Sequence, residues 1–273
     1  MVWRGCPFRL RNRAGVVDSL PENLSPNLPN FESMFGPPIY IVADESGFKH
    51  RVLDAYLQKG FYRMQHQLFT TNYTQFHTES YALPVFWLRI DLKKVEESST
   101  AKKIRKKCAG LTVTVKEADI NDEVRELYAL YWEYINFITS DRCEDYLHEE
   151  GTANPFDSKM IEIRDCGRLV AVGYFDQGEK SIAGILNFFH PEYHGFSLGK
   201  YLILQKLDYA KAMGCDYYYT GYLSTATEKF DYKLFPDIDA VEVFLPIEKR
   251  WVPYQHYGKN GLEDYVMRQM FGG

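Results

Sequence analysis

The sequence predicts an α+β protein: a mixed β-sheet forms a carboxy-terminal domain, residues 111–273, and a smaller α+β region, residues 1–110, precedes it. The length of 273 residues is enough for one large domain or two modest ones. A hydrophobic content of 45% and a charged content of 25% are ordinary for a globular protein. Strand-like and helix-like patterns follow one another along the chain, which predicts a mixed class.

The amino-terminal region is expected to contain one helix and two strands. Residues 18–40 are rich in proline and predict an irregular, extended lead-in. Apolar side chains recur at helical spacing in residues 49–60, and Gly60 ends the pattern. Residues 61–73 and 84–92 have the composition of strands.

The carboxy-terminal region alternates strands and helices. Gly214 is the expected stop of its longer amphipathic helix, because glycine readily takes the left-handed conformation after a helix end. The expected elements are a strand at 110–119, a helix at 121–140, three strands within 160–195, a helix at 197–214, a strand at 215–222 and a helix at 261–271.

Charge is unevenly distributed in this acidic chain. The net charge of −5 argues against non-specific coating of nucleic acid. Residues 89–108 nevertheless hold eight Lys or Arg against three Asp or Glu, and residues 4–13 hold four arginines. Such islands suit a partner touched locally through phosphates or carboxylates. The alternative is that the first island is a solvated hairpin tip or linker.

The cysteines predict neither a disulfide framework nor a zinc site. There are five, they are widely scattered, and no C-x-x-C pair occurs. No apolar run approaches the length needed to cross a membrane, and the amino terminus lacks the apolar core of a signal peptide. We therefore expect a cytoplasmic protein with no membrane partner and no metal.

A tyrosine-rich segment, "GCDYYYTGYLSTATEKFDYK" (residues 214–233), leads from a strand into a polar loop. It carries five tyrosines and ends in Tyr-Lys. Tyrosine favours strands, so packing against a helix explains part of the pattern. The other interpretation is a strand end that delivers phenols and ammonium groups to a substrate.

The order of elements resembles the core of GNAT acyltransferases: strand, turn, strand, a glycine-bearing loop into a helix, then another strand. That fold directs a helix amino terminus toward a phosphate, because its free N–H groups attract anions. In GNAT enzymes this loop usually has the sequence Q/R-x-x-G-x-G/A, and it binds the pyrophosphate of coenzyme A. Here the stretch is "YHGFSLGKYL", with Ser197 where the first glycine of the pair would stand.

Several motifs are similar to those of the arginyl-tRNA–protein transferase family, which includes the bacterial aspartate/glutamate leucyltransferase branch. In the carboxy-terminal half these are "GRLVAVGYFD", "SLGKY", "YYYTGY" and "KFDYK". In the amino-terminal half, "GCPFRLRNRAG", "YLQKGFYRMQHQLF" and "PVFWLRIDL" resemble family elements more loosely. The resemblance covers about residues 4 to 250.

The chain departs from the family pattern at several positions. Family members usually place cysteines between the two amino-terminal strands, whereas this chain has none there. His66, His77 and Glu79 are an inadequate substitute as metal ligands. Leu223 and Phe230 stand where the family has Tyr and Met. His190 replaces an acidic or amide residue, and the nearby "HPEYH" is expected to hold structural histidines.

The resemblance implies transfer of an aminoacyl group, arginine or leucine, from aminoacyl-tRNA to the N-terminal amine of acceptor proteins that begin with Asp or Glu. The ester is already activated, so the enzyme must position a neutral amine, stabilise an oxyanion and accept one proton. No Ser-His-Asp or Cys-His set and no cofactor are needed. A splayed backbone N–H is a candidate oxyanion donor, and Tyr219 or Tyr222 is the candidate proton donor or relay.

Binding roles implied by the resemblance fall on three groups of residues. The loop and helix start are candidates to bind a terminal tRNA phosphate. Two lysines are candidates to bind further phosphates or the acceptor's acidic side chain. Three arginines are candidates to bind the acceptor carboxylate, with which a guanidinium can form two hydrogen bonds. These groups are Ser197, Leu198, Gly199 and Lys200; Lys229 and Lys233; and Arg9, Arg11 and Arg13.

Two other functions stay open from the sequence. One is an acetyl-CoA-dependent N-acetyltransferase, which Ser197 and the lysine-bearing loop disfavour. The other is a non-catalytic member of the same family, which the missing cysteines and the changes at Leu223 and Phe230 suggest.

Overall fold

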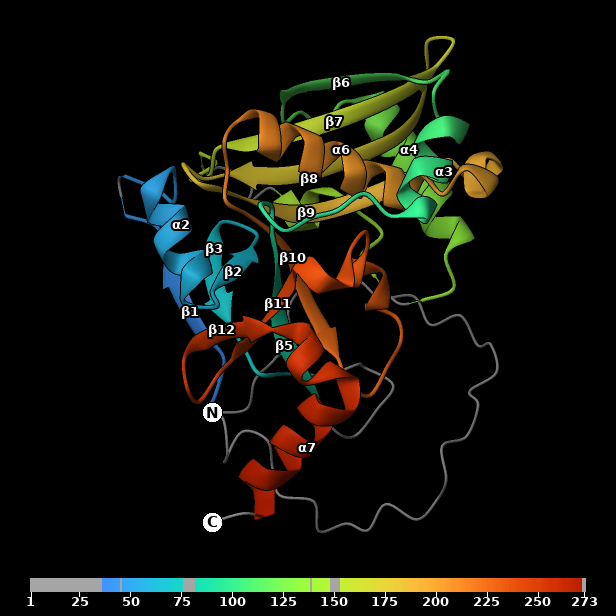
Figure 1. Cartoon of the computed structure of the whole chain (residues 1–273). Helices are drawn as coiled ribbons and strands as arrows, with labels where there is room; N and C mark the ends of the chain where they lie inside the picture. The colour runs from blue at the N-terminus through green and yellow to red at the C-terminus, as the bar shows by residue number, and fades with distance from the viewer. Residues whose placement is uncertain (1–35, 45, 76–81, 138, 148–152, 272–273) are drawn as a thin grey trace.

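A large mixed β-sheet forms the centre of the molecule (Figure 1). The computed structural model describes residues 36–44, 46–75, 82–137, 139–147 and 153–271. Within these ranges the sheet has nine strands in the order β12-β11-β5-β10-β9-β8-β7-β6, and β4 pairs with β5. The strands are β4 (Tyr73–Gln75), β5 (Ala82–Asp91), β6 (Thr112–Glu117), β7 (Ser158–Asp165), β8 (Arg168–Gln177), β9 (Ser181–Phe189), β10 (Tyr217–Ser224), β11 (Val241–Leu245) and β12 (Arg250–Pro253).

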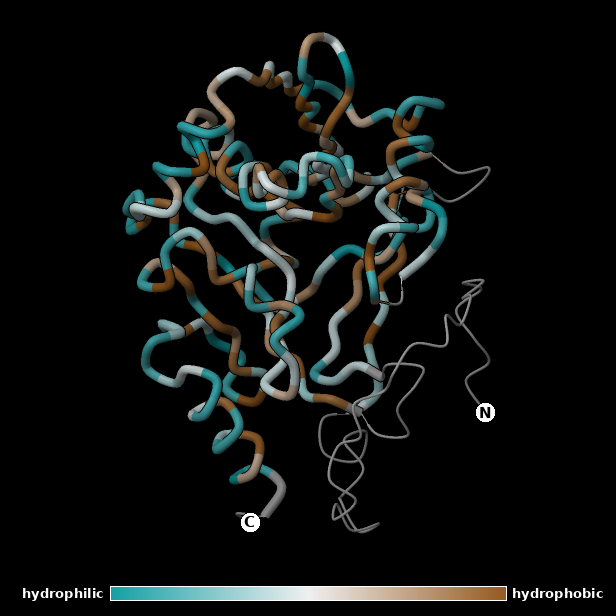
Figure 2. Tube along the Cα trace, turned by 90° about the vertical axis from the view of Figure 1, so that its right-hand side faces the viewer, coloured by the Kyte–Doolittle hydropathy of each residue, from teal (hydrophilic) through white to brown (hydrophobic). Residues whose placement is uncertain are grey.

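Helices cover both faces of this sheet, which confirms the predicted α+β class. Helix α6 packs on one face of β8 and β9, and α4 packs on the other. Figure 2 shows apolar and polar stretches alternating along strands and helices, as expected for elements with one buried face. The helices are α2 (Arg51–Gln58), α3 (Ser99–Lys107), α4 (Asp122–Tyr134), α5 (Glu144–Leu147), α6 (Leu198–Ala212) and α7 (Gly258–Phe271).

A second, three-stranded sheet lies beside α2 in the amino-terminal part. Its order is β1 (Ile39–Val42), β3 (Gln67–Thr70), β2 (Tyr62–Met64), all antiparallel. The single strand expected at 61–73 is therefore wrong: the segment folds back on itself as a hairpin. Gly60 ends α2 as predicted, with φ +79 and no room for a Cβ, which would lie 2.8 Å from the Phe244 ring.

Strand β5 joins the two parts of the chain. It pairs antiparallel with β10 and with β11, so residues before position 110 lie in the middle of the carboxy-terminal sheet. The division of the chain near residue 110 stays a prediction. In the described ranges no helix is long and apolar enough to cross a membrane.

Helix α4 is shorter than the pattern at 121–140 predicted. Asn121 caps it by accepting from the Val124 N–H, but it ends at Tyr134, after which Ile135 is extended. The hydroxyl of Tyr128 donates to the Ser140 carbonyl, which draws the following segment back along the helix. The tertiary contact made by Tyr128 therefore prevails over the helical spacing of apolar residues after Tyr134.

The basic segment at 89–108 forms the end of β5 and helix α3, and is neither a hairpin tip nor a linker. Ser98 Oγ caps α3 by accepting from the Ala101 N–H at 3.2 Å. Ala101 and Ile104 are buried on one side of the helix.

The strands β9 and β10 separate where the predicted acyltransferase core requires a splay. They pair in parallel only from Ser181 to Ala183, opposite Tyr217 to Tyr219. Beyond that point β10 has a bulge between Tyr219 and Gly221 and pairs with β5 alone. The strands before and after α6 are therefore parallel neighbours that splay apart.

A buried ion pair ties the hairpin to the large sheet. Arg63 on β2 contacts Asp176 on β8 at 2.6 Å, and both side chains are essentially inaccessible. Ser158 donates to the same carboxylate at 2.6 Å. Such a pair contributes little more to stability than apolar side chains packed in its place. Removing one partner, however, leaves an uncompensated buried charge.

We predict that Asp176→Asn lowers the free energy of unfolding by about 3–5 kcal/mol, because the Arg63 guanidinium loses its counter-charge. Chemical denaturation would measure the change. Glu179→Gln is the matched control, since Glu179 pairs with Arg51 at the surface and should leave the midpoint unchanged. Equal effects of the two substitutions would contradict the role of the buried pair.

Candidate functional site

The start of α6 gathers the loop residues singled out in the sequence. A 3₁₀ turn, η1 (Pro191–Phe196), leads into Ser197, which adopts the left-handed conformation with φ +58. The Ser197 side chain does not cap the helix. Because the first N–H groups of a helix lack intrahelical acceptors, this end attracts an anion.

The four candidate phosphate residues differ in what they can offer. Leu198 is fully buried, so only its backbone can contribute. Gly199 leaves the surface open, since a Cβ there would meet nothing nearer than Phe189 at 3.9 Å. The Lys200 ammonium lies 5.3 Å from the centroid of the Phe235 ring.

The histidines of "HPEYH" have structural partners. His190 caps η1 by accepting from the Glu192 N–H, and its Nε2 lies 2.7 Å from Arg168. His194 Nδ1 lies 3.0 Å from the Pro191 carbonyl oxygen. Across the described ranges no group of three or more His, Cys, Asp or Glu is placed to hold a metal ion. His77 and Glu79 lie outside these ranges, and the expected lack of a metal stays a prediction.

Tyr219 and Tyr222 face the same side of the sheet but have different surroundings. The Tyr219 hydroxyl accepts from Arg89 at 3.4 Å, and Arg89 also bonds Glu242. Burial raises the pKa of Tyr219 to about 12. Tyr222 lies one bulge further along β10, and its ring contacts Trp87 edge-on at a centroid distance of 5.3 Å. The two tyrosines therefore have different neighbours.

Lys233 lies directly beside the bulge of β10. Its ammonium donates to the Tyr222 carbonyl at 2.8 Å and lies 4.8 Å from the centroid of the Tyr222 ring. The centroid of the Phe230 ring lies 4.7 Å from the same ammonium nitrogen. Gly221 leaves it space, because a Cβ there would stand 2.9 Å from Lys233 Nζ. In the part of the chain that the structure describes, no carboxylate pairs with Lys233.

Burial among these groups favours the neutral form of the Lys233 amine. Burial and, to a smaller extent, the nearby charge of Lys229 together lower the pKa of Lys233 to about 7. Burial also lowers the pKa of Lys229, whose ammonium lies 4.3 Å from the Phe137 ring centroid. An anion entering here would be strongly attracted, and without one Lys233 is partly neutral at neutral pH.

Two tyrosines from other elements lie near Tyr232, the residue before Lys233. Tyr232, next to Lys233, is electrostatically coupled to Tyr131 on α4 and to Tyr222 on β10. Burial raises the pKa of Tyr222 and of Tyr131, the latter to about 12. These phenols are therefore hydrogen-bond donors at neutral pH and do not act as bases.

Sequence reasoning missed the contributions of Tyr62 and Tyr131. Tyr131 recurs at helical spacing with the apolar residues of α4, a pattern that indicates only a packed helix face. Tyr62 lies on β2, and its hydroxyl donates to the Gly184 carbonyl at 2.5 Å while lying 2.9 Å from the Tyr219 carbonyl. No local pattern could have indicated that contact. Arg9, Arg11 and Arg13 lie outside the described residues.

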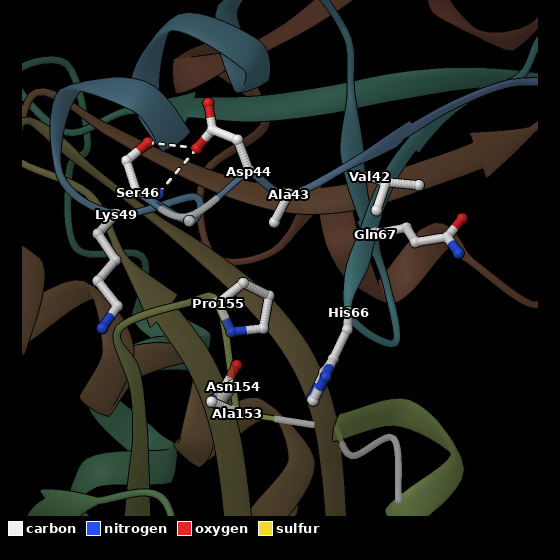
Figure 3. A pocket seen from close by; sticks show the side chains of 11 residues that line it. Val42, Ala43, Asp44, Ser46, Lys49, His66, Gln67, Ala153, Asn154 and Pro155 are labelled. Atoms are coloured by element: carbon white, nitrogen blue, oxygen red, sulfur yellow. Dashed lines mark hydrogen bonds between the residues drawn. The ribbon is translucent and has the colours of Figure 1, made fainter. Parts of the chain in front are cut away.

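A separate pocket of about 520 Å³ opens between the amino-terminal hairpin and the loop before β7 (Figure 3). Its wall includes Asp44, which accepts from the Ser46 N–H at 2.9 Å. Lys49, His66 and Asn154 also line it. It shares no lining residue with the start of α6 or with Lys233, so the two features are distinct.

The family model for "Arginine-tRNA-protein transferase, C terminus" matches residues 126–235. An Acinetobacter baumannii protein named aspartate/glutamate leucyltransferase is 31% identical over 154 residues, covering 53% of this chain and 55% of that protein. A Leptospira interrogans protein of the same name is 26% identical over 178 residues, covering 63% of this chain and 68% of that protein. The chain thus spans little more than half the length of the Acinetobacter relative.

Solved structures show a weaker likeness. FemX has a TM-score of 0.41 at 12% identity and covers 70% of this chain and 65% of its own. A GCN5-related N-acetyltransferase from Kribbella flavida has a TM-score of 0.33 at 11% identity, and the match covers 63% of this chain and 54% of that protein.

Lys206 on α6 is a second buried lysine, and its ammonium donates to the Tyr174 carbonyl at 2.7 Å. We predict that Lys206 and Lys233 titrate near pH 7, because burial lowers both pKa values to about 7. NMR of lysine labelled at Cε would measure this, with the resonances assigned by Lys206→Met and Lys233→Arg. Because the unfolded lysines bind protons more tightly, stability should rise with pH above about 7. Titration of both buried lysines above pH 10 would contradict the account of their surroundings.

Proposed function

We propose that the protein moves an amino acid from aminoacyl-tRNA to the N-terminal amine of an acceptor protein, on the premise that the match of residues 126–235 to the arginine-tRNA-protein transferase model makes the chain a member of that family. The observation that carries the proposal is the extent of the match. It runs from α4 to the residue after η2 (Asp231–Leu234) and so includes Tyr131, the start of α6, Tyr222 and Lys233. The geometrically assembled site and the matched segment coincide.

The site offers what aminolysis of an ester requires. The amine nitrogen forms a bond to the ester carbonyl carbon, the bond to the ribose oxygen breaks, and one proton moves from the amine to that oxygen. Beyond Ala183, the backbone of β9 has no ladder partner on β10. We propose that an N–H in this gap stabilises the oxyanion. No enzyme nucleophile is needed, because the ester is already activated.

We propose Lys233 as the group that takes the proton from the attacking amine. It has no carboxylate partner among the described residues, and its pKa of about 7 leaves it partly neutral at neutral pH. A base works best when its pKa is close to the working pH. The protonated amine of Lys233 would also attract a nearby phosphate, which is one of the two roles expected from the sequence, the other being contact with the acceptor's acidic side chain.

The surroundings support proton donation to the ribose oxygen by Tyr222 more than by Tyr219. Tyr222 lies with Lys233 at the splay, whereas Tyr219 is held by Arg89 within a cluster that includes Trp251. We propose that Tyr219 positions the strand. Lys229, Lys200 and the start of α6 remain the proposed contacts to phosphates of the tRNA end.

The donor and acceptor follow from the names of the relatives. Aspartate/glutamate leucyltransferases supply leucine as the first candidate donor, and the family model supplies arginine as the second. We propose acceptors that begin with Asp or Glu, held by Arg9, Arg11 or Arg13. The site of action we propose is the cytoplasm.

The test is transfer of labelled amino acids from total charged tRNA to peptides beginning with Asp, Glu or Ala. We expect leucine or arginine to be transferred to the Asp and Glu peptides and not to the Ala peptide. A parallel reaction with acetyl-CoA tests whether the protein is instead an N-acetyltransferase. Acetylation without aminoacyl transfer would overturn the proposal, and the absence of both would indicate a non-catalytic family member.

We predict that Lys233→Arg lowers the transfer rate by about 100-fold, because a guanidinium keeps its charge but cannot accept a proton. The wild-type rate should rise with pH through an apparent pKa of about 7, and the variant should lack this component. The acceptor amine titrates in both proteins, so the difference between the two profiles isolates Lys233. Lys233→Ala should be partly rescued by added small amines. A Lys233→Arg variant as active as wild type would leave phosphate binding as the role of this residue.

We predict separate effects for Lys229→Ala and Arg11→Ala. Loss of Lys229 should weaken tRNA-dependent transfer and reduce its salt dependence, as expected for a phosphate contact. Loss of Arg11 should reduce the preference for an acidic acceptor by on the order of a hundredfold and leave tRNA affinity nearly intact, since an acceptor carboxylate loses its partner. Equal losses of salt-dependent tRNA affinity, with acceptor preference unchanged, would show that this division of roles is wrong.

A further inference from the structure

Helix α3 carries four lysines on one exposed face. Lys102 and Lys106, and likewise Lys103 and Lys107, are four residues apart and lie in two adjacent rows, while Ala101 and Ile104 are buried on the opposite side. We call these four lysines the α3 lysine face. Arg105 is on the helix flank and is already paired with Glu97 and Asp208.

The α3 lysine face is not balanced by nearby acids. Within the ranges that the structure describes, no ion pair joins any of its four ammonium groups to a carboxylate. Like charges four residues apart on a helix destabilise it by roughly 0.2–0.5 kcal/mol per pair. The helix dipole favours cations in the last turn, which accounts for Lys106 and Lys107. It does not account for Lys102 and Lys103, which lie in the first half of the helix.

This face borders the proposed active site. Lys107 Nζ donates to the Gly195 carbonyl at 2.5 Å, and Cys108 Sγ donates to the Phe196 carbonyl at 3.6 Å. Both carbonyls belong to η1, immediately before α6. Figure 1 shows α3 lying beside α6. The α3 lysine face thus continues the electropositive start of α6 outward along the surface.

We propose that the α3 lysine face binds the sugar–phosphate backbone of the tRNA acceptor stem. The proposal rests on the proposed function and adds to it the surface that holds the body of the substrate. Ammonium groups contact phosphates without reading base sequence, which suits a tRNA held by its backbone while its aminoacyl end enters the site. A chain with a net charge of −5 that concentrates beside this site four lysines with no carboxylate partner among the described residues is organised for such local contact.

The test uses the full chain and purified total tRNA. The double variant Lys102→Gln/Lys106→Gln is compared with Lys180→Gln/Lys249→Gln, which removes two exposed lysines from turns elsewhere. Affinity for uncharged tRNA is measured across a series of salt concentrations. The α3 variant should lose about 1.4–1.8 units from the slope of log K against log[salt], since each of the two phosphate contacts contributes roughly 0.7–0.9. The control variant should keep the wild-type slope.

Each result decides the proposal. An α3 variant with the slope of its control would overturn it. A weaker affinity of the α3 variant for poly-glutamate, with tRNA affinity unchanged, would also overturn it and indicate an acidic protein partner. Loss of tRNA affinity in the α3 variant supports the surface even when no aminoacyl transfer is detected, because binding is measured without the reaction. With transfer present, the variant should raise the KM for charged tRNA and leave kcat unchanged.

Discussion

The hydroxyl of Tyr62 bonds the backbone of two neighbouring strands at the place where they part. It donates to the Gly184 carbonyl on β9 and lies 2.9 Å from the Tyr219 carbonyl on β10. The Tyr62 ring is stacked on Trp87 of β5 at a centroid distance of 5.1 Å, so the hydroxyl is held in position. Parallel pairing of β9 and β10 ends one residue earlier, at Ala183. A residue of the amino-terminal hairpin therefore fixes the splay on which the site depends.

The site that follows from this splay combines buried lysines with protonated phenols. Beyond the β10 bulge, Gly221 makes room for Lys233, whose ammonium bonds the Tyr222 carbonyl. Burial lowers the pKa of the amine and raises the pKa of the phenols. One environment thus favours the neutral form of the amine and of the phenols alike, because desolvation disfavours whichever form carries charge.

Local signals in the sequence predicted the elements that local interactions determine. The glycine-bearing loop into α6 and the strand β10 follow from periodicity and from turn residues such as Gly214. The position of β5 between β10 and β11 was not predictable, since strand pairing over such separations leaves no local pattern. For the same reason Tyr62 gave no signal. The tyrosines of β10 were identified as candidates, but only their surroundings distinguish Tyr222 from Tyr219.

The most direct test of the account is a structure with an RNA minihelix that carries leucine or arginine through a stable 3′-amide in place of the ester. The account predicts that the aminoacyl carbonyl lies in the gap between β9 and β10, closer to Lys233 Nζ than to the Tyr219 hydroxyl. A complex in which the aminoacyl group occupies the pocket beside Lys49 and His66, with the gap between β9 and β10 unfilled, would contradict it.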